Sequence, residues 1–406
     1  MYRKCVAFNM IRNMIRAGLP SLLIALLSAC GDDSNLNQPT ELEPFNSRYY
    51  LDVSWLASTG VGVEEQYLFL EPLILSKKAV TSSRDGVLNI IDLETGDFDK
   101  EIELNSLISA GVGGDESLWL VATRDAYVIA IDAEKRREKW RTRVSSEVLA
   151  KPVIYNDTVL VRSIDGKIIS LDKFNGKIRW QYERTIPALT LRGSGDLVLS
   201  RGRVIAGLAD GRLIALSPDT GEVLWDVALA VPKGHSEIQR LVDIDGDAEI
   251  YGRILYAASF QGRVAAIDVE RGQFLWARDF STHTGVTVDD KVLYSTDDNG
   301  FIWALDRYNG ATIWKQSKLA YRNVTRPTII GDYLAVGDFE GYIHLLSRFD
   351  GHFVARYQLG QFDHPGWEKA TGIIVPPIVF KENRILVITR GGISYVLGLH
   401  KRDDDY

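Results

Sequence analysis

Residues 165–180 read "DGKIISLDKFNGKIRW": an Asp-Gly turn, an alternating strand, an Asn-Gly turn, and a second strand that ends in tryptophan. Asp-Gly and Asn-Gly pairs tolerate the positive φ of tight hairpin turns, and apolar residues at every second position indicate strands rather than helices. The pattern recurs in three clear copies and four weaker or incomplete ones: residues 210–225, 261–276 and 299–314, then 85–100, 125–140, 340–355 and 391–400.

The spacing of these copies indicates the architecture. Consecutive copies begin 40, 40, 45, 51, 38, 41 and 51 residues apart. A repeat of roughly 40 to 45 residues with about four strands has the size of one propeller blade. The sequence therefore predicts an all-β fold, an eight-bladed β-propeller of four-stranded antiparallel blades that covers residues 48–400.

The ends of the chain indicate how the ring closes. The eighth copy stops after "SYVLGLH" (394–400), and residues 401–406 form a charged tail. The segment "RYYLDVSWLAS" (48–58) carries its own tryptophan, Trp55, and can supply the missing outer strand. Pairing the first strand with the last blade removes two exposed sheet edges, so we expect the N-terminal strand to complete that blade.

The tryptophans of the clear copies are expected to be structural. Each lies four residues after a glycine, as in Trp180 after Gly176, Trp225 after Gly221, Trp276 after Gly272 and Trp314 after Gly310. A large ring on an outer strand fills the wedge between neighbouring blades. We predict packing between blades as their role, rather than contact with a ligand.

The N-terminus has the pattern of a secretory signal. Basic residues precede the apolar run "AGLPSLLIALL" (17–27), which is too short for a membrane span. The following "LSAC" (27–30) resembles the lipobox of bacterial lipoproteins, which implies a signal peptide over 1–29 and a lipid on Cys30. An ordinary cleavage site is the alternative, but the only other cysteine, Cys5, lies in the part removed.

By the same resemblance, Gly31 directly after the cysteine implies sorting to the outer membrane, on its periplasmic side. Residues 30–47 are polar and contain proline, and we predict a flexible tether there. From residue 30 onward the chain has 43 basic and 54 acidic residues, a net charge of −11. This balance argues against a nucleic-acid partner.

No motif for catalysis stands out. The six histidines are scattered without zinc spacing, and neither a G-x-S-x-G elbow nor a cysteine nucleophile is present in the mature chain. We therefore expect no enzyme activity, no cofactor and no metal. The repeats resemble those of quinoprotein dehydrogenases, which hold pyrroloquinoline quinone and calcium, so a periplasmic quinone-dependent dehydrogenase remains the alternative. Many of those enzymes use a vicinal disulfide, which this chain cannot form.

Two long links interrupt the repeat. Residues 184–196 (the first link) and 231–249 (the second link) join the outer strand of one blade to the inner strand of the next. Such links emerge on one face of the disc, so two successive long ones are neighbours. Loops on a rigid scaffold commonly carry function. A third insert, residues 361–377, lies on the same face nearly opposite across the ring.

The second link contains "RLVDIDGDAEI" (240–250), with Asp243, Asp245, Asp247 and Glu249 at alternate positions. A calcium loop, a catalytic acid cluster, a solvated turn and a docking surface are the alternatives. The EF-hand order requires glycine sixth and glutamate twelfth, whereas here glycine is fourth and Ile254 is twelfth. A docking surface fits best.

With "LTLRG" (189–193) and "RLVDID" (240–245), the chain resembles the BamB family, lipoprotein subunits of the machinery that inserts β-barrels into the bacterial outer membrane. The resemblance implies a non-catalytic scaffold that binds the periplasmic POTRA domains of BamA, and through BamA the other subunits. The implied contact residues are Leu189, Leu191, Arg192, Asp243 and Asp245. Unfolded outer-membrane proteins are a further possible partner, by addition of strands to blade edges.

Two departures from the family pattern are the long basic segment before the lipobox and Gly246-Asp247 after the matched acids. The first leaves the start of translation open between Met1, Met10 and Met14. The second leaves the shape of the second link open. A generic lipoprotein binding module for another envelope component remains a third reading.

Overall fold

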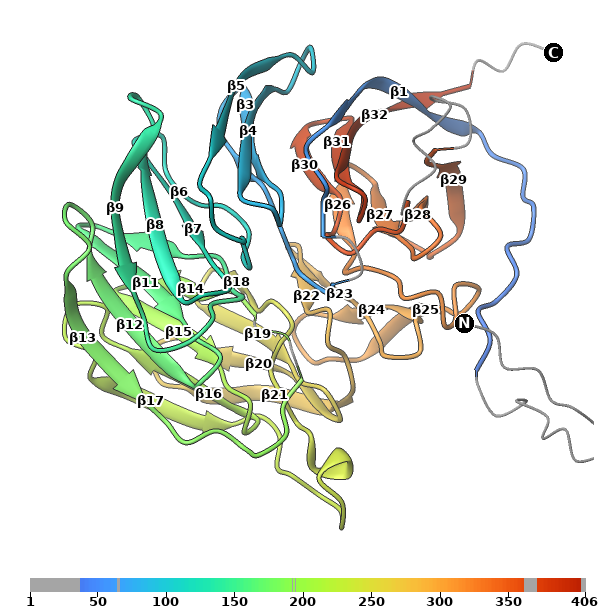
Figure 1. Cartoon of the computed structure of the whole chain (residues 1–406). Helices are drawn as coiled ribbons and strands as arrows, with labels where there is room; N and C mark the ends of the chain where they lie inside the picture. The colour runs from blue at the N-terminus through green and yellow to red at the C-terminus, as the bar shows by residue number, and fades with distance from the viewer. Residues whose placement is uncertain (1–36, 64–65, 192, 194, 361–370, 403–406) are drawn as a thin grey trace, which may run out of the picture. The chain divides into compact units, whose positions relative to one another are not determined.

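The computed structural model describes residues 37–63, 66–191, 193, 195–360 and 371–402. The chain divides into two units, residues 1–38 and residues 39–406, and only the second is described below. Its described residues form eight four-stranded antiparallel sheets, which Figure 1 shows as successive blades. Among these residues there is no helix with the length and apolar character needed to cross a bilayer.

Seven sheets are built from four consecutive strands each, inner strand first. The first four are β2 (Leu73–Ile74), β3 (Lys78–Ser82), β4 (Val87–Asp92), β5 (Phe98–Glu103); β6 (Gly113–Gly114), β7 (Leu118–Ala122), β8 (Tyr127–Asp132), β9 (Arg137–Arg143); β10 (Val153–Tyr155), β11 (Thr158–Arg162), β12 (Lys167–Asp172), β13 (Ile178–Glu183); and β14 (Val198–Ser200), β15 (Arg203–Gly207), β16 (Arg212–Leu216), β17 (Val223–Ala228).

The next three are β18 (Glu249–Tyr251), β19 (Ile254–Ala258), β20 (Gly262–Asp268), β21 (Gln273–Phe280); β22 (Val286–Val288), β23 (Val292–Thr296), β24 (Ile302–Asp306), β25 (Thr312–Gln316); and β26 (Thr328–Ile330), β27 (Tyr333–Gly337), β28 (Tyr342–Ser347), β29 (Phe353–Gln358). The one short helix in the described part is the 3-10 helix η1 (Ile238–Arg240).

The eighth sheet closes the ring as the sequence predicts. Its order is β30 (Ile378–Lys381), β31 (Arg384–Ile388), β32 (Ile393–Lys401), with β1 (Tyr49–Ser58) outermost. Strand β1 pairs antiparallel with β32 along its whole length, from Tyr49 opposite Lys401 to Ser58 opposite Ile393. The predicted eight-bladed propeller with an N-terminal closing strand is confirmed.

The repeated Asp-Gly pair shapes the link between the second and third strand of a blade. In residues 163–166 the Gly166 N–H donates to the Ser163 carbonyl at 3.1 Å, and Ser163 pairs back to Lys167. Gly166 has φ of +85°, a conformation that glycine adopts without strain. The result is a three-residue hairpin, a turn followed by a left-handed glycine, rather than the two-residue hairpin that an Asp-Gly pair most often makes.

The tryptophans pack between blades, as predicted. The ring of Trp225 on β17 covers Gly272 of the next sheet so closely that a Cβ there would lie 2.7 Å from it. Its indole Nε1 also donates to the Val269 carbonyl of that sheet at 2.8 Å. Five other blade junctions repeat this pair, with Trp55 on Gly96, Trp140 on Gly176, Trp180 on Gly221, Trp276 on Gly310 and Trp314 on Gly351.

The expectation of a flexible tether over residues 30–47 differs from the structure for residues 39–47. These residues hold fixed contacts to the sheet β26–β29, which begin at Thr40 and continue through Ser47. A polar, proline-bearing composition favours a solvated chain, but here specific partners on a distant blade bind it. Residues 30–36 and 403–406 lie outside the described residues, as does the part of the third insert from 361 to 370.

Candidate functional site

The first and second links contact each other directly. The backbone N–H of Leu191 in the first link donates to Oδ2 of Asp243 in the second. Further along, the N–H of Asp196 donates to Oδ1 of Asp247 at 3.1 Å. The prediction that the two long links are neighbours on one face is therefore confirmed, and side-chain carboxylates of the second link hold the backbone of the first.

The five predicted contact residues fall into three groups. Leu189 is exposed to 41%, and Leu191 is half-buried beside a cavity between the links. Arg192 lies outside the described residues. Asp243 is only 1% exposed and the Asp245 side chain is also buried, 3.8 Å from the Arg162 guanidinium.

The two acids are therefore not the exposed partners for basic groups that their spacing suggested. The segment that carries them is covered because Leu241, Val242 and Ile244 are buried in the protein. The backbone continues this attachment, since the Phe260 N–H donates to the Asp243 carbonyl at 2.9 Å. Asp243 and Asp245 therefore lie beneath the first link, where Asp243 accepts a hydrogen bond from its backbone.

Burial determines the electrostatics of these two carboxyl groups. It raises the pKa of Asp243 to about 6, against the lowering effect of the Leu191 N–H and of Arg162. It raises the pKa of Asp245 to about 8, because Arg162 offsets only part of the loss of solvation and Asp243 adds negative charge. Asp243 and Asp245 therefore keep their protons to a higher pH than an exposed aspartate does.

The four acids of the second link do not converge on one point. Asp247 Oδ2 lies 3.4 Å from the Arg326 guanidinium, and Glu249 Oε2 accepts a hydrogen bond from the Val288 N–H at 2.9 Å. Within the described ranges no group of three or more His, Cys, Asp or Glu side chains is placed to hold a metal ion. The arrangement argues against a calcium loop, because each acid already serves a separate contact.

Charged pairs also brace the two links against other links of the same face. The Lys151 ammonium lies between Glu71 and Asp196, with Asp196 Oδ2 at 3.1 Å. Burial by itself lowers the pKa of Lys151, but the neighbouring carboxylates outweigh it and raise that pKa. Since Glu71, Lys151 and Asp196 belong to three different links, the face that carries the site is held rigid.

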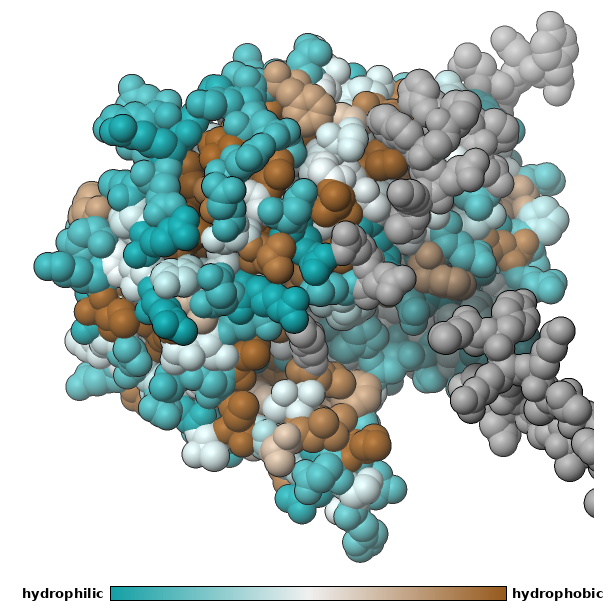
Figure 2. All heavy atoms as spheres, viewed as in Figure 1, coloured by the Kyte–Doolittle hydropathy of each residue, from teal (hydrophilic) through white to brown (hydrophobic). Residues whose placement is uncertain are grey.

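The exposed apolar side chains of this face were missed by the sequence reading. Val231 and Ile238 in the second link are 62% and 67% exposed. Figure 2 shows apolar surface around this projecting segment, which Figure 1 draws in yellow-green with the short helix η1 at its tip. Ile164 and Ile186 line a cavity of about 260 Å³ beside Leu191. Apolar residues at link positions, outside the period-two strands, were the signal that could have found them.

We refer to the surface made by Ile164, Ile186, Leu189, Leu191, Val231 and Ile238 as the docking face. The first and second links, which are hydrogen-bonded to each other, present five of these side chains, and Ile164 in the β11–β12 turn lies beside Ile186 and Leu191. Exposed apolar anchors on a preorganised support are typical of a protein-binding surface. The geometry offers anchors for a partner rather than a set of reacting groups.

Comparison with known proteins agrees with this architecture. A family model described as "Outer membrane protein assembly factor BamB" matches residues 73–316. A protein of that name from Bordetella pertussis is 36% identical over 370 residues, which are 90% of this chain and 92% of that protein. The crystal structure of BamB from Moraxella catarrhalis aligns with a TM-score of 0.75 and 28% identity, covering 86% of this chain and 99% of that one.

A quinohemoprotein alcohol dehydrogenase from Comamonas testosteroni also aligns, with a TM-score of 0.66 but 13% identity, over 86% of this chain and 76% of that one. That likeness shows a shared fold alone. The relatives with substantial identity over most of the chain carry the assembly-factor name. The chain belongs to the BamB family of outer membrane protein assembly factors.

Proposed function

We propose that this protein is a non-catalytic scaffold of the outer-membrane β-barrel assembly machinery, and that its docking face binds the periplasmic POTRA domains of BamA. The family name of its relatives supports a part in outer-membrane protein assembly. The observation that carries the docking proposal is the direct contact between the first and second links, which holds exposed apolar side chains in a fixed arrangement.

The proposed roles of the site residues follow from their positions. Leu189 and Leu191 act as apolar anchors that lose water when the partner binds. Arg192, from its place between them and Gly193 in the sequence, offers a guanidinium fork to a carboxylate or carbonyl of the partner. Asp243 and Asp245 act as positioning residues beneath the first link.

The proposal includes attachment to the membrane. Cleavage of a signal peptide over 1–29 leaves Cys30 as the first residue, and a lipid on it anchors the protein to the outer membrane facing the periplasm. The mature chain holds no second cysteine, which leaves this thiol without an internal disulfide partner. Intact mass measurement of the N-terminal peptide from membrane fractions tests this, with the acyl mass expected on Cys30.

Retention of BamA by the tagged, purified protein tests the docking site. Leu189→Ser is expected to weaken retention, because it removes an apolar anchor from the docking face. Leu224→Ser is the matched control: Leu224 is 46% exposed on the outer strand β17, away from the links. Equal retention of BamA by both variants contradicts the proposed site.

The variant Asp243→Ala distinguishes a positioning role of this residue from direct contact with BamA. The residue is buried, so any loss of BamA must act through the first link rather than through a lost contact. We expect weaker retention in this variant and in Arg192→Ala, with the far-ultraviolet circular dichroism of the propeller preserved. Full retention by both would show that the two links do not form the interface.

A further inference from the structure

The N-terminal strap (residues 39–47) is attached to the sheet β26–β29 before the first strand begins. The Thr40 N–H donates to the Ala320 carbonyl at 3.0 Å, and the Arg322 guanidinium donates to the Thr40 carbonyl at 3.1 Å. The backbone N–H and the backbone carbonyl of Thr40 are thus both bound by the link that precedes β26. Two hydrogen bonds to one residue fix both its position and its direction.

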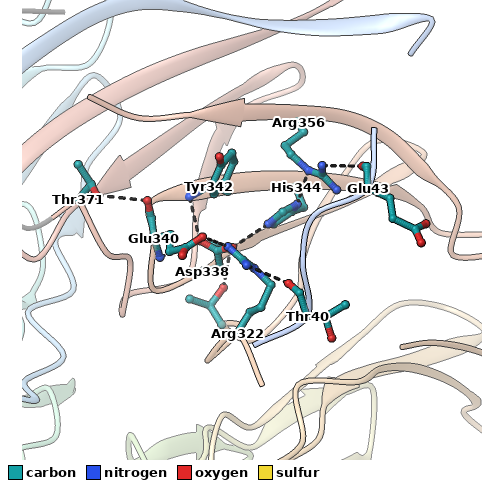
Figure 3. Close-up of polar contacts among 11 residues, drawn as sticks. Thr40, Glu43, Arg322, Asp338, Glu340, Tyr342, His344, Arg356 and Thr371 are labelled. Atoms are coloured by element: carbon teal, nitrogen blue, oxygen red, sulfur yellow. Dashed lines mark hydrogen bonds and ion pairs between the residues drawn. The ribbon is translucent and has the colours of Figure 1, made fainter. Parts of the chain in front are cut away.

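Arg322 is itself held rigidly, as Figure 3 shows. It is 3% exposed, its Nε donates to Asp338 Oδ2 at 2.8 Å, and its Nη2 pairs with Glu340. A buried guanidinium needs such partners to offset its lost hydration. Because they orient Arg322 independently of the strap, the site that receives the Thr40 carbonyl is preformed.

A second arginine holds the middle of the strap. Arg356 on β29 donates through Nη1 to the Glu43 carbonyl at 3.0 Å and through Nε to His344 Nδ1 at 3.1 Å. Since Nδ1 accepts, Nε2 carries the proton of the neutral ring and donates to Asp338, 3.1 Å away. Figure 3 shows these groups as one network that joins both arginines to the strap.

Apolar contacts complete the attachment. Leu42 packs against the core cluster between the sheets β22–β25 and β26–β29, and the ring centroid of Phe45 lies 5.6 Å from that of Phe353. The exposed ion pair of Glu43 with Lys318 adds little by comparison. The strap therefore has both polar and apolar anchorage along its length.

The strap crosses the sheet from one face of the disc to the other. Thr40 lies at the link 317–327, which joins the outer strand β25 to the next inner strand β26, as the first and second links join their strands. Thr40 therefore lies on the docking side, the side of the disc that carries the docking face. The strap ends at Tyr49, which pairs with Lys401 at the far end of β32. The first residues of the strap therefore lie on the docking side.

We propose that the strap turns the docking face toward the membrane that holds Cys30, an inference that rests on the proposed lipid anchor. Eight residues (31–38) separate that cysteine from the strap, so the distance from Cys30 to residue 39 is at most about 30 Å. A six-residue strand such as β28 is about 20 Å long, which gives the thickness of the disc. A tether that starts on the docking side would use most of its length to reach past the disc to the opposite face. The opposite face is held away from the bilayer.

Energy transfer from single fluorophores to headgroup-labelled vesicles tests this on the lipidated full-length protein. An introduced cysteine is the only free thiol once Cys30 is acylated. Lys233→Cys lies in the second link, and Asp219→Cys lies at the opposite end of β17, in the turn after β16. We expect the larger loss of donor emission from the label at position 233. Equal loss, or a larger loss at 219, overturns the proposal.

Two variants test whether the strap is the cause. Inserting twenty Gly and Ser residues between Gln38 and Pro39 raises the reach of the tether to roughly 100 Å and leaves every strap contact intact. Replacing Leu42 and Phe45 with serine instead releases the strap. We expect either change to reduce the difference between the two labels, and an undiminished difference in the insertion variant overturns the proposal.

The proposed docking function has its own readout. If BamA does not bind, retention fails while the difference between the labels remains. If the orientation is wrong, the difference disappears while BamA is retained. Absence of the acyl mass on Cys30 overturns the orientation together with the lipid anchor and leaves the BamA assay standing by itself.

Discussion

Replacing Gly272 with alanine should destabilise the propeller more than the same change at Gly252, although the backbone conformations are nearly identical. Gly272 has φ of +65° and Gly252 has +66°, so both variants carry the strain of a left-handed alanine, about 1–2 kcal/mol. At Gly252 nothing lies within 4 Å of the new Cβ. At Gly272 the new Cβ meets the Trp225 ring at 2.7 Å, which adds about 1–3 kcal/mol of overpacking.

Urea unfolding followed by far-ultraviolet circular dichroism measures both free energies of unfolding. The expected difference between the variants is about 1–3 kcal/mol, all of it from the ring contact. A double-mutant cycle isolates that contact, since the extra cost of Gly272→Ala should vanish in a Trp225→Ala background. Equal costs for the two glycine variants, or an extra cost that persists without the ring, would refute the assignment of the tryptophans as spacers between blades.

Three further predictions concern the docking side. Leu189→Ala should raise the Kd for BamA about three- to eightfold in a titration. Leu189 is 41% exposed before binding, and full burial of a leucine side chain is worth about 1.5–3 kcal/mol. An unchanged Kd would exclude Leu189 from the interface. Asp243→Ala removes the acceptor of the Leu191 N–H, so hydrogen exchange at that amide should accelerate while exchange in the core strands does not. Asp245→Asn should gain stability relative to the parent protein as the pH rises from about 4 to 8. The pKa of Asp245 is about 8 in the folded state, above its value in the unfolded chain. The unfolded chain therefore loses this proton first, and the parent protein loses stability across that pH window, whereas the asparagine variant does not. Thermal unfolding at pH 5 and pH 8 measures this, and a pH-independent difference contradicts it.

Most of the propeller could be predicted because its signals are local. Each Asp-Gly or Asn-Gly pair determines a turn within a few residues, and the alternation of apolar residues determines which face of a strand is buried. The closing strand β1 could be predicted because the eighth copy of the repeat lacks its fourth strand. The neighbouring position of the two long links follows from the ring order alone.

What escaped prediction depends on contacts between distant residues. The alternate acids of the second link look like one exposed row, yet Asp243 is buried because the first link covers it. The strap escaped for the same reason: its composition is that of a solvated linker, and its partner Arg322 lies 282 positions away from Thr40. No pattern within residues 39–47 carries the information that Arg322 and Asp338 form a receptor for that backbone.

The closing strand also has a consequence for the order of folding. Strand β1 is made first, but its partner strand is β32. Thr59, directly after β1, likewise donates its hydroxyl to the Gly392 carbonyl, which lies 333 positions later in the chain. Closing so long a loop is slow, and the ring cannot form until the last blade has been synthesised. During that interval β1 is an unpaired edge strand, vulnerable to aggregation and to proteases. Truncation within the last blade should therefore trap an open ring rather than yield a smaller stable propeller.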